Sequence, residues 1–208
     1  DHYYYDDMQT EDRVATLINT SYMPLCKTLA EMIRLSKGRF HCALSVSGTM
    51  LEMFEQYNPE MIDVLKELAG TGCVEFVVTP YSYSLASVYS DTEAAEQLVK
   101  QQAQVKQLLG VESTTAALTE LLYSDELAIQ LHKMGFKAVM TEGAKHILSW
   151  KSPNYVYSSS AAPKLKVLLR NITLSDELAF HFSDSTWHNF PMDAEKFATA
   201  LATLPEEE

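Results

Sequence analysis

The chain has few of the features that bind nucleic acid or cross a membrane. Its 208 residues include 16 lysines and arginines against 28 aspartates and glutamates, a formal net charge of −12. Binding to a nucleic-acid backbone needs clustered basic side chains, so this balance excludes nucleic acid and favours neutral or cationic partners. No apolar run approaches the roughly 20 residues of a membrane-spanning helix, and no signal peptide opens the chain. The sequence therefore predicts a soluble, cytoplasmic protein with no membrane partner.

Cysteine is scarce as well, with only Cys26, Cys42 and Cys73 in the sequence. An odd number without CxxC or Cys/His ligand spacing fits neither a disulfide framework nor a zinc site, so we expect small buried hydrophobic residues. The sequence also lacks a histidine cluster with metal-ligand spacing, a glycine-rich phosphate loop and a GxSxG motif. We therefore expect neither a metal ion nor a cofactor.

The composition is that of a folded domain, with 47% hydrophobic and 21% charged residues. The length suits one sizeable core or a large part of a barrel. No internal repeat or low-complexity linker divides the chain, so we expect one domain over residues 1–208. The abrupt start in DHYYYDD and the end in PEEE lead us to expect a fragment that lacks its first strand and its C-terminal part.

Short β-rich runs alternate with helical patterns, which is typical of a mainly parallel sheet surrounded by helices. Strands are predicted in five runs, at residues 39–48, 73–81, 114–118, 136–143 and 165–171. Helices are predicted at residues 13–36, 50–57, 60–69, 91–109 and 191–204, and in a segment that ends at Gly135. The first helix is expected to be interrupted near Pro24 and to bury Leu25, Leu29, Met32 and Ile33. The last helix is expected to pack Met192, Phe197, Ala200, Leu201 and Leu204 inward.

Residues that face a ligand in such folds follow the carboxyl ends of the strands. Those positions hold Ser47, Thr49, Thr79, Tyr81, Tyr83, Thr119, Glu120, Thr141, Glu142, Asn171, Ser175, Asp176 and Glu177. Two carboxylates across a cleft can cleave a glycosidic bond, one as nucleophile and one as proton donor. Glu120 and Asp176 are the natural pair, because strand ends converge at the mouth of a barrel. The structural alternative is that Glu120 is a charge at the start of the next helix and that Asp176 is a helix cap.

Five segments, in order along nearly the whole chain, resemble one glycosidase family. They are DHYYYDD, FHCALSVSGTMLEMFEQYNPEMIDVLKELAGTGCVEFV, LTELLYSDELAIQLHKMGFKAVMTEG, WKSPNYVY and LLRNITLSDELAFHFS. Together they are similar to glycoside hydrolase family 57, in its α-amylase and α-amylase-like branch. The resemblance implies an α/β fold, an incomplete (β/α)7 barrel, with retaining chemistry on α-1,4-glucans such as starch or glycogen. It implies Glu120 of the TEL motif as nucleophile and Asp176 of the LSD motif as acid/base, with Phe180 four positions later.

Other residues are candidates for contacts with the sugar. Thr119 and Tyr123 are expected to hydrogen-bond around Glu120. The substrate-binding candidates are Tyr81, Tyr83, Thr119, Glu75, Glu142, Trp150 and Trp187, with Tyr3 to Tyr5 as further stacking aromatics. For each of them the alternative is structural: a partly buried aromatic ring, or a carboxylate that hydrogen-bonds beside a strand. The histidines at 2, 146 and 188 are expected at the surface or the edge of the core.

The chain also departs from the family pattern. The family's His-Gln-Pro motif is missing from it, and Thr79 and Tyr83 stand where amylase-branch members typically show Glu and His. Ala117 and His181 replace two arginines of the catalytic motifs. A second hypothesis is therefore a catalytically impaired relative that binds α-glucan or is structural only, because lost sugar contacts weaken transition-state binding. A third, a deacetylase-like barrel, is disfavoured by the lack of an Asp/His/His metal set.

Overall fold

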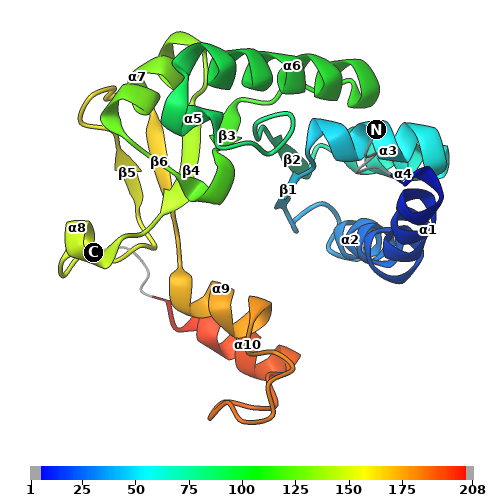
Figure 1. Ribbon diagram of the computed structural model, residues 1–208. Coiled ribbons are helices and arrows are strands. Elements are labelled where there is room, and N and C mark those ends of the chain that lie inside the picture. Colours follow the sequence, from blue (N-terminus) through cyan, green and yellow to red (C-terminus); the bar gives the residue numbers. More distant parts are fainter. Residues whose placement is uncertain (1–5, 205–208) are drawn as a thin grey trace. The chain divides into compact units, whose positions relative to one another are not determined.

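The computed structural model describes residues 6–204, and the chain forms two compact units, Asp1–Thr119 and Glu120–Glu208 (Figure 1). Each unit combines helices with short strands, and most strand pairs are parallel. The α/β class predicted from the sequence is therefore confirmed. Within the described residues, no helix has both the length and the apolar character needed to cross a bilayer.

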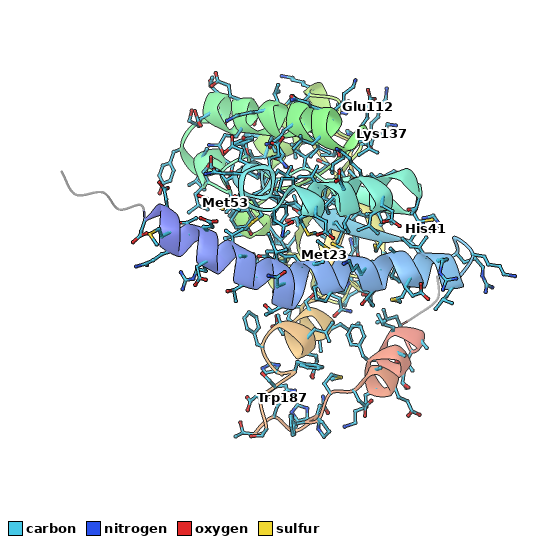
Figure 2. The ribbon with its side chains drawn as sticks, turned by 90° about the vertical axis from the view of Figure 1, so that its right-hand side faces the viewer. Met23, His41, Met53, Glu112, Lys137 and Trp187 are labelled. Atoms are coloured by element: carbon cyan, nitrogen blue, oxygen red, sulfur yellow. The ribbon has the colours of Figure 1, made fainter. Side chains whose placement is uncertain are left out.

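The first unit begins with a long helical run made of α1 (Asp7–Leu17), η1 (Ile18–Tyr22) and α2 (Met23–Leu35), seen lengthwise in Figure 2. The middle segment is π-helical and ends two residues before Pro24. Proline has no backbone N–H to donate within a helix, and a wider π turn accommodates this defect without ending the helix. The interruption expected near Pro24 therefore takes the form of a π segment.

The π segment also explains why the predicted buried face of this helix is partly wrong. Leu25 is 50% exposed and Met32 is 42% exposed, whereas Val14, Ile18, Met23, Cys26 and Ile33 are buried. The step from Ile18 to Met23 spans five residues, as a π turn requires, and it rotates the apolar stripe away from the spacing of an ideal α-helix.

Three parallel strands follow in the first unit. The pair β1 (Cys42–Ser45) and β2 (Val74–Val77) is in register from Cys42 opposite Val74 onward, and a bridge from Val78 to Ala116 adds β3 (Thr115–Ala117). Parallel neighbours need a crossover between them, and helices supply it here. The crossover helices are α3 (Gly48–Tyr57), α4 (Pro59–Gly70), α5 (Ala86–Tyr89) and α6 (Asp91–Leu109).

The core of the first unit lies between these helices and the strands. Its most enclosed side chains include Ile18, Leu51 and Leu68, none of which is exposed. All three cysteines are free; Cys26 and Cys73 are buried in this core, and the half-buried Cys42 packs against it. The expectation of small, packed, unbridged cysteines is confirmed.

The second unit holds a small sheet in which β6 (Lys166–Arg170) lies between β4 (Ala138–Glu142) and β5 (Val156–Ser158) (Figure 1). β6 runs parallel to β4 and antiparallel to β5. The sequence pattern predicted β4 and β6 but not β5, whose exposed Val156 and Ser158 flank a half-buried Tyr157 and form no apolar run. The remaining elements are η2 (Thr119–Leu121), α7 (Asp125–Lys133), α8 (Lys145–Leu148), α9 (Ile172–Ala179) and α10 (Ala194–Ala202).

The expected inward packing of the last helix is confirmed only in part. Met192, Phe197, Ala200 and Leu204 are half-buried, but Leu201 is 47% exposed and no residue of α10 is fully buried. An apolar stripe at helical spacing shows which face could be covered, but the neighbour that covers it is not encoded in that spacing.

Candidate active site

Glu120 sits in a turn with an unusual backbone. It has φ 56° and ψ 25°, and the next residue, Leu121, has φ 54°. Left-handed conformations are sparsely populated by residues other than glycine and cost on the order of 1–3 kcal/mol each. The buried Thr141 of β4 holds this turn, because its hydroxyl donates a hydrogen bond to the Leu121 carbonyl at 2.8 Å. The turn leaves Glu120 exposed.

Glu120 lines a cleft of about 820 Å³ in the second unit. The walls come from the η2 turn and the start of α7, from the end of β4, and from α8 and the β5 region. Carboxylates and hydroxyls gather there: Glu120, Tyr123, Ser124, Asp125, Thr141, Glu142, Tyr157, Ser158, Ser159 and Ser160 all line it. Apolar side chains such as Leu121, Ile147 and Leu169 form much of the remaining wall, and a cleft of this size with a few polar groups is suited to a small molecule.

Arg170 connects this cleft with Asp176. It ends β6 opposite Glu142 in the parallel register. Its Nε lies 3.0 Å from Glu142 Oε2, and its Nη2 lies 3.6 Å from Asp176 Oδ1. All three side chains are about one-third exposed. A planar guanidinium can serve two carboxylates at once; here Arg170 hydrogen-bonds to Glu142 and forms a longer ion pair, without a hydrogen bond, to Asp176.

Arg170 was missed by the sequence analysis. Its position could have indicated a role, because Arg170 is a cation that directly follows the apolar run LKVLL at a strand end. Only the pairing of β6 with β4 shows which carboxylates it meets.

The helix-cap alternative is wrong for Asp176, whereas Glu120 is the first-turn acid of the short 3-10 segment η2. Helix α9 is capped by Asn171, whose side chain accepts from the Leu174 N–H at 3.0 Å, so Asp176 is not its cap. Helix α7 is capped by Ser124, and its first-turn acids are Asp125 and Glu126. Glu120 therefore precedes that helix rather than charging its first turn.

Tyr81, a predicted sugar contact, is buried inside the first unit. Its hydroxyl donates to the Glu52 carboxylate, and the Lys100 ammonium lies 3.5 Å from the centre of its ring. Burial and the adjacent Glu52 carboxylate raise the pKa of Tyr81 to about 12. Gly48 faces the same ring. The phenol is thus enclosed by its own unit.

Of the other residues of the first unit that were predicted to contact the sugar, one lines a cleft and two make hydrogen bonds within the protein. Tyr83, with φ 52°, lines a cleft of about 470 Å³ together with the buried Thr79. Glu75 accepts a hydrogen bond from the Thr115 hydroxyl across β2 and β3. Thr119, expected beside Glu120, donates instead to the Ser84 carbonyl at 2.7 Å.

The two tryptophans of the second unit differ. Trp150 is 87% exposed after α8. Trp187, labelled in Figure 2, stacks on His181 with ring centres 3.7 Å apart and an interplanar angle of 5°. Its Nε1 donates to both oxygens of the buried Glu177 at 3.1 Å. One face of Trp187 is therefore already covered.

Two predictions on aromatic and histidine residues fall on the N-terminal segment: Tyr3 to Tyr5 and His2 lie outside the described residues. His146 is exposed, as expected, and His188 lies 4.4 Å from Trp187, ring centre to ring centre. Across residues 6–204, no group of three or more His, Cys, Asp or Glu side chains is placed to hold a metal ion.

A comparison with protein families decides the affiliation. The model described as Glycosyl hydrolase family 57 matches residues 1–208. The chain belongs to glycosyl hydrolase family 57. This family 57 chain is also 33% identical over 205 residues to a protein of Methanocaldococcus jannaschii that is provisionally named an alpha-amylase. The match covers 98% of this chain but 43% of that relative, so the chain spans less than half of the relative's length.

Two solved structures resemble the family 57 chain in fold. The 4-alpha-glucanotransferase of Thermococcus litoralis has a TM-score of 0.68 at 17% identity, over 84% of this chain and 27% of that one. A protein of Mycobacterium smegmatis, provisionally named a polysaccharide deacetylase, has a TM-score of 0.63 at 15% identity, over 94% of this chain and 65% of that one. At such identities the likeness concerns the fold alone.

Proposed function

We propose that this family 57 chain carries the catalytic carboxylates of a retaining glycoside hydrolase that acts on α-1,4-glucans. Glu120 is the nucleophile and Asp176 the acid/base. The observation that carries the proposal is the bridge made by Arg170, which contacts Asp176 and also Glu142. Glu142 lines one cleft with Glu120, whereas Asp176 does not line it; the contacts of Arg170 with Glu142 and Asp176 support the choice of Asp176 as the second carboxylate.

The proposed reaction has two steps. In the first, the Glu120 carboxylate attacks the anomeric carbon while Asp176 donates a proton to the glycosidic oxygen, which leaves as a sugar hydroxyl. In the second, Asp176 takes a proton from water as the water oxygen attacks the same carbon and releases Glu120. Retaining chemistry predicts a separation of about 5–5.5 Å between the two carboxyl groups in the substrate-bound protein.

The substrate proposal rests on the family and on the cleft. The Methanocaldococcus relative bears an alpha-amylase name, and the Thermococcus litoralis structure is that of a 4-alpha-glucanotransferase. Tyr123, Tyr157 and the serines at 158–160 line the cleft with Glu120. The Tyr157 hydroxyl already donates to the Ser152 carbonyl and the Ser159 hydroxyl accepts from the Ala162 N–H, which leaves Tyr123, Ser158 and Ser160 as the better candidates to contact a sugar. Such groups exchange hydrogen bonds with the hydroxyls of a neutral sugar.

A second candidate is a family member that binds α-glucan, or is structural, without turnover. Two observations favour it: the enclosed Tyr81 and the Trp187 ring that His181 covers leave fewer free stacking surfaces. The same assay separates the candidates.

The test is release of reducing ends from maltooligosaccharides by the full-length protein. Glu120→Gln keeps the side-chain size but removes the nucleophile, so we expect kcat to fall by about 10³-fold or more. Glu112→Gln is the matched control; it removes an exposed ion pair to Lys106 and is expected to leave kcat unchanged.

Undiminished turnover by a folded Glu120→Gln protein would remove Glu120 from the proposed mechanism. If the folded wild type releases no reducing ends but is retarded by immobilised glucan, the non-catalytic candidate holds instead.

A further inference from the structure

Glu177 is a buried carboxylate that the proposed reaction does not use. It is 6% exposed and follows Asp176 directly in α9. Its oxygens accept from Trp187 Nε1, at 3.1 Å each, and from Asn189 Nδ2 at 3.1 Å. None of the ion pairs within residues 6–204 includes Glu177. A buried carboxylate is costly without such partners, so its presence calls for a role beyond packing.

The carboxylate is held in its charged form. Burial raises the pKa of Glu177, but the hydrogen bonds from Trp187 and Asn189, with the nearby His181 and His188, outweigh burial and lower that pKa below its ordinary value. A charged acceptor strengthens the hydrogen bonds that it receives. The segment 181–190 is thus bonded firmly to α9.

The same segment is bonded to the backbone of Asp176. The Phe180 and His181 N–H groups both donate to the Asp176 carbonyl, at 3.0 and 3.1 Å. His181 also stacks on Trp187, which donates to Glu177. A continuous path of contacts therefore runs from the Glu177 side chain through Trp187 and His181 to the main chain of Asp176.

We propose that Glu177 is a positioning residue for Asp176. By binding Trp187 and Asn189 it fixes segment 181–190 on α9, and this segment in turn fixes the backbone that carries Asp176. Arg170 supports the same residue from the other end, at its carboxylate. The inference rests on the proposed acid/base role of Asp176.

The consequence is specific to proton transfer. Asp176 must reach the glycosidic oxygen within hydrogen-bond distance, and a misplacement of about 1 Å can cost about 100-fold in rate. In Glu177→Gln the side chain keeps its size, but one carboxylate oxygen becomes an amide NH₂ group. This group cannot accept a hydrogen bond, so it would face the Trp187 N–H or the Asn189 amide as a second donor, and one hydrogen bond would be lost. The segment would then loosen and Asp176 would lose its position.

The test compares two substrates that differ in their need for an acid. The sugar leaving group of maltoheptaose needs a proton from the acid to depart as an alcohol, whereas the fluoride ion of α-maltosyl fluoride departs with little assistance. We measure kcat/KM, which reports steps up to the glycosyl-enzyme, for the full-length protein. Glu177→Gln is expected to lower it about 10- to 100-fold on maltoheptaose and by less than about threefold on the fluoride.

Two further variants keep the test decisive. Glu195→Gln makes the same change at an exposed glutamate of α10 and is expected to alter neither value. Trp187→Phe keeps a ring against His181 but removes the donor to Glu177, so it should show the same split between substrates. If circular dichroism shows that Glu177→Gln is unfolded, Trp187→Phe takes its place in the test.

The outcomes separate this inference from the proposed function. Equal losses on both substrates would make Glu177 merely structural, and no loss on either would make it dispensable; in both cases the wild type still turns over glucan and its function stands. A folded wild type that turns over neither substrate would overturn the proposed function and this inference with it.

Discussion

At the scale of single residues, Tyr81 shows how closely the first unit is packed. Its ring lies against Gly48, where an added Cβ would come within 2.2 Å of two ring carbons. The ring cannot move aside easily, because its hydroxyl is bonded to Glu52 and Lys100 lies over its face. Position 48 therefore requires glycine for space.

Gly48→Ala is expected to lower the free energy of unfolding by about 1–3 kcal/mol, the usual cost of overpacking. Urea denaturation followed by circular dichroism measures it. Gly70→Ala is the matched control: nothing lies within 4 Å of its added Cβ, and it ends helix α4, so a neutral or slightly stabilising effect is expected. Equal effects of the two substitutions would show that the Tyr81 ring yields to the new methyl group.

Residue types at strand ends predict which carboxylates can act but not what holds them. Glu120, Glu142 and Asp176 all stood out as polar residues after apolar runs. Arg170 belongs with them only because β6 pairs with β4 and α9 follows directly. These partners are 28 and six positions away in the sequence, and local patterns carry no information on such contacts.

At the scale of elements, helices with capping residues at both ends were predicted well. Helix α6 spans Asp91–Leu109, as predicted, because Ser90 caps one end and the left-handed Gly110 closes the other. The first helix lacks such local marks at its start and at its π segment, so its end near Ser36 was predicted, but its start at Asp7 and part of its buried face were not.

Ser90→Ala is expected to destabilise the protein by about 1 kcal/mol, because the Glu93 N–H would lose the acceptor that Ser90 Oγ provides at 3.2 Å. Thermal unfolding by calorimetry measures the change. Ser90→Asp retains an acceptor and adds a charge favoured at a helix start, so it should remain near the wild type. A similar loss in both variants would show that the hydroxyl contributes by something other than capping.

At the scale of the whole molecule, family membership was the most predictable property. Motifs spread in order along the chain indicated family 57, and the match over residues 1–208 confirms it. A single domain and an incomplete (β/α)7 barrel stay predictions, since both depend on pairings between segments far apart in the sequence. The roles of Glu120 and Asp176 also remain proposals.

The net charge of −12 leads to a prediction on salt dependence. A neutral glucan is neither attracted nor repelled over long range, so kcat/KM on maltoheptaose should change by less than about twofold between about 0.05 and 0.5 M NaCl. Steady-state kinetics at several salt concentrations measure it, with Tm followed in parallel to exclude unfolding. A steep dependence at constant Tm would indicate a charged substrate instead.

The turn formed by Glu120 and Leu121 affects both the thermal stability of the protein and the position of the proposed nucleophile. In this turn two successive residues other than glycine adopt the left-handed conformation. Glycine at position 121 would relieve part of the backbone strain, and selection for a more heat-resistant protein would favour it. The same relaxation would let the proposed nucleophile swing away from its target. Under the proposed mechanism we therefore expect stability and reaction rate to depend on the same two left-handed residues, with a gain in one accompanied by a loss in the other.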